Sequence, residues 1–209
     1  KTSEKVKESL NLSEAKNDTD TKKTEKNIKK YEADYKKICK IYQHLRNDTV
    51  ERGNLSTKNM TKYTALIQDE LKKYIADYAE NGYAKSQLSG KKAVNSDGTE
   101  FISEEINKLA DKTVERFIDD MSVKIKSKNK SIDDCFIFME YRLRFACNFL
   151  SQKAYWYGFV KGCAVRGAKR LTIKLSDDHK KEHKSVIHTD NFNIDNIPPF
   201  SPYCTCSIV

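Results

Sequence analysis

The spacing of apolar side chains changes character once along this 209-residue chain, close to Gly167. Before that glycine, apolar residues advance by threes and fours, which places them on one face of an α-helix. After it, Leu171, Ile173 and Leu175 alternate with polar residues, as in a half-buried strand. The sequence therefore predicts an α+β fold: a predominantly helical body of about four helices at 24–167, followed by a small β-rich C-terminal subdomain at 168–209.

Three helices are predicted in the first part of the body. The first starts near Lys26 and ends before Gly53. The second starts with Thr57 as N-cap and ends with Gly82 as C-cap, and the third starts at Ser103 after a loop at 88–100. The apolar stripe of the first helix comprises Ile28, Tyr31, Tyr35, Ile38, Tyr42 and Leu45.

The fourth predicted helix, 132–157, is apolar almost all round, which is typical of a buried central helix. Ser131 and Asp134 form a capping-box pattern at its start. We expect Phe145 and Phe149 to lie in the core, and the cysteines of the body to pack as small apolar side chains. The helix also carries charged residues that need partners or an interface, namely Glu140, Arg142 and Arg144.

The β-rich subdomain has too few residues to build a large core, and domains of that size usually need a disulfide or a metal ion. Segments 169–176, 185–189 and 204–209 are the predicted strands. The same region holds most of the chain's histidines and two of its six cysteines. Since zinc prefers four nitrogen or sulfur ligands, we expect a zinc site formed by His179, His183, Cys204 and Cys206.

Two features of these residues favour a metal-free alternative. Cys204 and Cys206 are two residues apart, so on a flat strand they would point to opposite faces. Both can bind one ion only if the chain turns there, for which Pro202 and the prolines before it provide a reason. Without such a turn the cysteines would pack as small residues and the histidines would lie at the surface, with no cofactor.

The segment "HKKEH" at 179–183 also matches the H-x-x-E-H pattern of a zinc-peptidase helix, with Glu182 as the base. Such a helix needs an apolar face to sit in a cleft, and "SDDHKKEHKS" has none. We also find no Ser/His/Asp set, phosphate loop or paired-carboxylate pattern that stands out. The sequence therefore predicts that the chain is not an enzyme.

The C-terminal third resembles a known family. The long helix "EYRLRFACNFLSQKAYWYGFVKG", the strand "KRLTIKLS", the segment "DDHKKEH" and the terminus "IPPFSPYCTCSIV" follow one another in the order seen in the phage Mu F-like head morphogenesis (minor capsid) family. That family has a C-x-x-C knuckle after the strand and ends in P-P-x-H-P-x-C-R-C. Here His179 and His183 stand at the knuckle cysteines, Ser201 at the histidine and Thr205 at the arginine.

The resemblance implies a structural minor capsid protein of a tailed phage, located in the virion inside the capsid and assembled in the host cytoplasm. It implies several copies in an assembly with the portal or the major capsid protein as partner, and packaged DNA as a further contact. The polar arm at 1–23 has too few apolar residues to order itself, so we expect partner chains to hold it.

The net charge of +9 suits an anionic neighbour, although lysines that merely solvate the surface would give the same value. The charge leaves open a second interpretation, a basic nucleic-acid-binding module with a zinc-stapled tail. We expect no membrane contact, because no apolar run approaches the roughly 20 residues of a membrane span. A start at Lys1 rather than Met indicates a mature or partial product.

Overall fold

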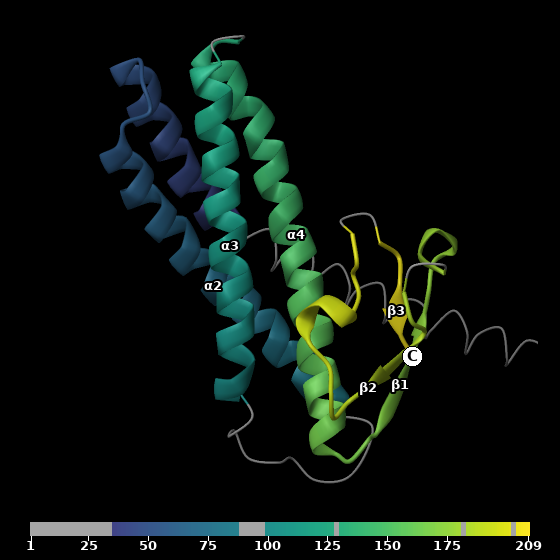
Figure 1. Cartoon of the computed structure of the whole chain (residues 1–209). Helices are drawn as coiled ribbons and strands as arrows, with labels where there is room; N and C mark the ends of the chain where they lie inside the picture. The colour runs from purple at the N-terminus through teal and green to yellow at the C-terminus, as the bar shows by residue number, and fades with distance from the viewer. Residues whose placement is uncertain (1–34, 88–98, 128–129, 181–182, 202–203) are drawn as a thin grey trace, which may run out of the picture. The chain divides into compact units, whose positions relative to one another are not determined.

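The computed structural model describes residues 35–87, 99–127, 130–180, 183–201 and 204–209. The predicted arm at 1–23, the first turns of the first helix, most of the 88–100 loop, Glu182 and Pro202 lie outside them. Ile38–Val209 forms one compact unit. It contains helices at its N-terminal end and a three-stranded antiparallel sheet at its C-terminal end, so the α+β prediction is confirmed (Figure 1).

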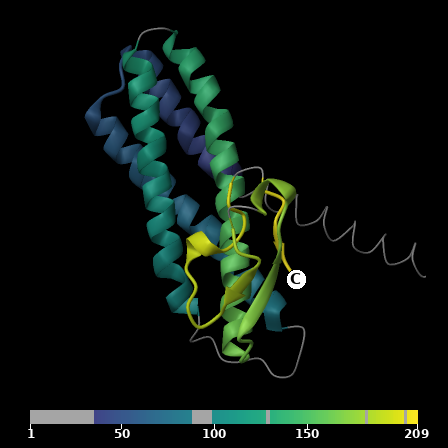
Figure 2. The ribbon, with the colours of Figure 1, turned by 45° about the vertical axis from the view of Figure 1, so that its right-hand side comes forward.

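The helical elements are a segment at 35–52, α2 (Thr57–Gln87), α3 (Thr99–Lys126) and α4 (Ile132–Val165). In the two views α3 and α4 run side by side, with the start of α4 next to the end of α3 (Figures 1 and 2). Within the part of the chain that the structure describes, no helix has both the length and the apolar character needed to cross a membrane.

Several predicted helix ends differ from the observed ones. Ser56, not Thr57, caps α2, because its Oγ accepts from the Asn59 amide at 3.2 Å. Helix α3 starts at Thr99, four residues before the expected Ser103. Gly82 lies inside α2 and Gly158 inside α4, where both are buried. Glycine at these two positions reflects close helix packing rather than a helix end.

Helix α4 ends at Val165, beyond the predicted end at 157, and Gly167 follows it with a φ of +85°, a backbone conformation that favours glycine. Its N-terminus matches the sequence prediction: the Ser131 Oγ accepts from the Asp134 amide at 3.1 Å. The charged residues of α4 have partners as expected. Gln43 donates to Glu140 at 2.9 Å, and Arg142 pairs with Asp120 at 3.0 Å.

Helix α4 is the centre of the unit, and elements on several sides pack against it. Tyr42, buried in the 35–52 helix, donates a hydrogen bond of 2.7 Å to the Phe136 carbonyl. Arg46 makes a bidentate pair with Asp133, with both N–O distances 2.8 Å. Phe136, Met139 and Leu143 point into this core and are at most 2% exposed.

The prediction that Phe145 and Phe149 belong to the core is wrong, since both are only half-buried. Their side chains lie in a groove between α3 and α4. The reason is that the helix has several apolar faces, and the described residues cover only some of them. Four of the six cysteines are buried, namely Cys135, Cys147, Cys163 and Cys206. Cys39 and Cys204 are half-buried, and no disulfide joins any of the six.

The sheet has the order β2-β1-β3 and consists of β1 (Arg170–Lys174), β2 (Val186–His188) and β3 (Ser207–Ile208). Leu171 lies opposite Ile187, and Ile173 lies opposite Ile208. Ile173, Ile187 and Ile208 are buried, whereas the other two residues of the predicted alternation, Leu171 and Leu175, are half-buried. Two three-residue 3-10 helices, η2 (Asp177–His179) and η3 (Ile194–Asn196), lie in the connections.

Candidate metal centre

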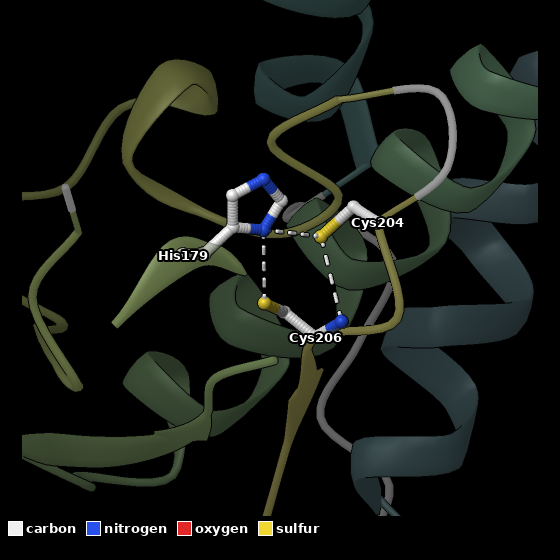
Figure 3. A group of neighbouring side chains, drawn as sticks. All are labelled: His179, Cys204 and Cys206. Carbon is white, nitrogen blue, oxygen red and sulfur yellow. Dashed lines mark hydrogen bonds between the residues drawn. The ribbon is translucent and has the colours of Figure 1, made fainter. Parts of the chain in front are cut away.

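The pairing of the last strand brings the end of the chain to the segment that follows β1. Lys174 lies opposite Ser207, and the Val209 amide donates to the Thr172 carbonyl at 3.0 Å. Strand β1 therefore ends at the same place at which β3 begins. The residue that follows β1 by five positions, His179, and the one that precedes β3, Cys206, meet there (Figure 3).

A tight turn after β1 directs His179 toward the cysteines. The turn includes η2, and the His179 amide donates to the Ser176 carbonyl at 3.0 Å. Lys180 pairs with Asp177 at 2.6 Å across the same turn, and this exposed pair lowers the pKa of the Asp177 carboxyl through its hydrogen bond. The His179 ring is thereby presented from a short turn and not from a long helix.

Cys204 and Cys206 lie on the same side of the chain, because the backbone there is not a strand. β3 begins only at Ser207. The Cys204 amide donates to the Ser201 carbonyl at 3.0 Å, and the Cys206 amide donates to the Cys204 sulfur at 3.4 Å. This curl removes the objection that a C-x-C pair on a flat strand would point to opposite faces.

The three side chains form a compact donor set, which we call the His–Cys–Cys cluster: His179, Cys204 and Cys206. His179 Nδ1 lies 3.4 Å from the sulfur of each cysteine, and all three possible ligand atoms lie within 4.8 Å of one another (Figure 3). Cys206 is buried and the other two are half-buried. The cluster could hold a metal ion.

The fourth predicted ligand, His183, is not part of the cluster. Its ring stacks on Phe200, with ring centroids 3.9 Å apart and an interplanar angle of 8°. The His179 and His183 rings meet edge to face at 5.3 Å. The two histidines therefore do not converge as the two ligands of an H-x-x-E-H helix do, and His179 lies in a 3-10 turn instead.

Two residues that the sequence analysis did not select also shape the site. The Ser176 amide donates to the Cys206 sulfur at 3.1 Å, and its hydroxyl lies 3.2 Å from His179 Nδ1. These two contacts hold the Cys206 sulfur and the His179 ring in place within the cluster. The one feature that could have indicated the contact of Ser176 with the cluster is its place directly before the η2 turn, as the N-cap.

Lys153 of α4 anchors the segment that carries the cysteines. It is 4% exposed, and its ammonium donates to the carbonyls of Ile197 and Pro199 at 2.6 and 3.0 Å. These residues flank Pro198, and the Pro198–Pro199 peptide bond is cis. Burial lowers the pKa of Lys153 to about 8, against the opposing influence of Asp195 and Cys204. In the sequence, the only indication of this anchoring role is that Lys153 lies within an otherwise largely apolar stretch of α4.

No protein-family model, curated protein or solved structure matches this chain.

Proposed function

We propose that the chain is a structural protein of virus assembly, a minor capsid or head morphogenesis protein of a tailed phage. The observation that carries the proposal is the His–Cys–Cys cluster. It joins the two segments, after β1 and at the chain end, in which the sequence resembles the phage Mu F-like family. A metal-binding set that links the end of the chain to the sheet would stabilise the fold, and this supports a structural rather than a catalytic role.

Zinc is the ion that the donor set fits best, because two thiolates and an imidazole are ligands that zinc prefers. Ligand distances of about 2.0 Å for nitrogen and about 2.3 Å for sulfur place tetrahedral N and S donors about 3.5 Å apart. The separations of His179 Nδ1 from Cys204 and Cys206 are 3.4 Å. When bound, zinc would supply a cross-link between the turn after β1 and the C-terminal segment.

Tetrahedral zinc takes a fourth ligand beyond the His–Cys–Cys cluster. His183 is the nearest histidine in the sequence, four residues after His179. Its ring stacks on Phe200 in the structure, so its binding would need the ring to leave that stack. Water is the alternative ligand, and the metal content of a His183→Ala variant distinguishes the two.

The proposed surroundings follow from the family. The partner is the portal or the major capsid protein, the location is the virion interior, and several copies act together. The net charge of +9 suits a neighbourhood of packaged DNA. These assignments rest on the resemblance and on charge.

The experiment is to isolate phage heads and to locate the chain by mass spectrometry before and after removal of the DNA. We expect the chain to stay with the heads after the DNA is removed, and to leave them only when the portal is removed. The contrary result is a chain found only free in the lysate. If the purified chain then binds DNA with a steep salt dependence, it is a nucleic-acid-binding module instead.

A further inference from the structure

The groove between α3 and α4 is a hydrophobic surface that the part of the chain described by the structure leaves uncovered. It has a volume of about 620 Å³. Ten residues line it, four on α3 and six on α4. The groove is far from the His–Cys–Cys cluster in the sequence and shares no residue with it.

An aromatic stripe forms one wall of this groove. Phe138, Tyr141, Phe145 and Phe149 follow one another at intervals of three, four and four residues, so they lie on one face of α4. Phe138 is 47% exposed and Tyr141 is 63% exposed, and the rings of Tyr141 and Phe145 stack with centroids 6.1 Å apart. Aromatic residues exposed together in this way are typical of binding surfaces rather than of solvent-facing helices.

Positive charge borders the stripe. The lining includes the cations Lys112, Arg116 and Arg142 and not a single carboxylate. Lys124 adds a further cation, with its ammonium 4.5 Å from the centre of the Phe138 ring. Arg142 is paired with Asp120, whose carboxylate lies outside the lining. A ligand in the groove therefore meets aromatic rings in the middle and cations along the edge.

We propose that this groove binds an acidic amphipathic α-helix of another protein. The stripe from Phe138 to Phe149 covers twelve residues of α4, and the eleven steps between its ends give a length of about 16 Å, or three helical turns. A helix of that length can place apolar side chains at i, i+3, i+4 and i+7 against the rings. Aspartate and glutamate on its flanks would face Lys112, Arg116 and Lys124.

Two other occupants fit less well. A second copy of this chain carries the same net charge of +9, so two such surfaces repel each other. A single strand of nucleic acid would use the cations, but it needs a polar path for its phosphates, and six of the ten lining residues are Leu, Ala or aromatic. The proposal stands on this groove and does not require the assignment to a phage head.

The test uses the full-length chain and two synthetic helix-stapled 18-residue peptides. Both carry the same leucines at i, i+3, i+4 and i+7, one with glutamate and the other with lysine at the flanking positions. Fluorescence anisotropy gives the Kd of each. We expect the glutamate peptide to bind about tenfold or more tightly than the lysine peptide, and its binding to weaken about tenfold in Tyr141→Ser.

Charge reversal separates the groove from general electrostatics. Arg116→Glu should reduce the preference for the glutamate peptide by about tenfold, whereas Lys58→Glu, at an exposed position of α2, should not change it. Val123→Ser is the matched control for Tyr141→Ser, because Val123 is 67% exposed and lies outside the groove. Equal binding of the two peptides, or equal effects of the groove and control variants, would overturn the proposal.

Two further measurements assign the groove to another occupant. Binding of a 20-nucleotide oligothymidine that Tyr141→Ser and Arg116→Glu abolish, without binding of the glutamate peptide, assigns the groove to nucleic acid. A concentration-dependent dimer in sedimentation that Tyr141→Ser abolishes assigns it to a second copy. Either result contradicts the helix proposal.

Discussion

Lys153 is a buried cation whose two hydrogen-bond partners are carbonyls of the C-terminal segment. An ammonium in such a position costs free energy through desolvation, which is the main reason its pKa falls to about 8. What the lysine provides in return is a directed contact between α4 and the segment that leads to Cys204 and Cys206. It is a positioning residue for the His–Cys–Cys cluster, although it does not belong to it.

We predict that Lys153 makes the stability of the protein depend on pH in the alkaline range. In the unfolded chain the lysine keeps its proton up to about pH 10, whereas in the folded chain it loses the proton near pH 8. The unfolded state binds more protons between these values, so stability rises with pH. Its contribution should rise by about 2 kcal/mol from pH 8 to pH 10.

Urea unfolding of the wild type and of Lys153→Met at pH 8, 9 and 10 measures this contribution. The difference in free energy of unfolding between the two should change with pH in the stated direction. Lys85→Met is the control, because Lys85 lies exposed in the last turn of α2. A pH profile of Lys153→Met that is parallel to that of the wild type would refute the prediction.

The residues of the candidate site were partly predictable from the sequence. Zinc chemistry and sequence clustering selected His179, Cys204 and Cys206, and the structure brings these three together. His183 was selected on the same grounds, but its ring found a flat apolar partner in Phe200. Ser176 escaped notice because it acts through its backbone amide, and a sequence carries no direct signal for such a contact.

Glycines determine how closely α2 and α4 approach each other. A Cβ added at Gly158 would lie 1.9 Å from the Ala79 carbonyl oxygen, and one added at Gly82 would lie 1.9 Å from that of Tyr155. Both neighbours are backbone atoms, which cannot turn away as the end of a side chain can. The two helices can therefore keep this spacing only with glycine at the crossing.

We predict that Gly158→Ala destabilises the protein by about 3 kcal/mol or more, because α2 and α4 would have to separate. Thermal unfolding followed by circular dichroism measures the loss. Gly167→Ala is the comparison: a Cβ there meets nothing within 4 Å, and only the φ of +85° opposes it. That variant should lose about 1 kcal/mol. Equal losses in the two variants would mean that α2 and α4 tolerate a wider spacing.

A second prediction at the level of the element concerns the two aromatic faces of α4. Phe136 is 0% exposed and packs against Tyr42, with ring centroids 5.4 Å apart. Phe136→Ala should cost about 3–5 kcal/mol. Phe145→Ala should cost less than half as much, because the groove already exposes part of that ring. Urea unfolding of both variants checks this. If Phe145→Ala loses as much free energy of unfolding as Phe136→Ala, Phe145 belongs to the core after all.

Periodicity predicted the existence and the type of the helices and strands, and those predictions are confirmed where the structure describes them. It failed at the ends of helices, where glycine has two meanings. Gly167 has a positive φ and ends α4, whereas Gly82 and Gly158 have a close neighbour and lie inside helices. A glycine in the sequence does not reveal which of these two structural reasons applies. The sequence of α4 also could not show which apolar face is covered, since that depends on which helices pack beside it.

At the scale of the whole molecule, the end of the chain is held by the pairing of β3 with β1 and by two further kinds of contact made by the residues that precede β3. One is made by protein groups alone: Lys153 holds the carbonyls beside Pro198, and the ring of Phe192 lies 5.5 Å from that of Tyr157. The other is the His–Cys–Cys cluster, in which the three donors come close without a covalent bond between them. A metal ion would make the second contact strong, because ligand binding to the folded state adds to its stability.

The last prediction is that zinc stabilises the C-terminal segment while leaving the helices unchanged. At a free zinc concentration about 1,000 times Kd, binding adds about 4 kcal/mol, which raises Tm by roughly 10 °C for a unit of this size. Cys204→Ser should lose this increment and should contain no stoichiometric zinc by elemental analysis. Cys39→Ser is the matched control, a half-buried thiol on the 35–52 helix outside the cluster.

Hydrogen exchange locates the effect of zinc within the chain. Chelation should expose the amides of β3 and Cys206 to exchange, whereas those of α4 should stay protected, because α4 is held by its contacts with the other helices. If chelation does not change Tm and the purified protein contains no zinc, the prediction is wrong. The end of the chain would then be held by the pairing of β3 with β1, the packing of Cys206 and the hydrogen bonds of Lys153.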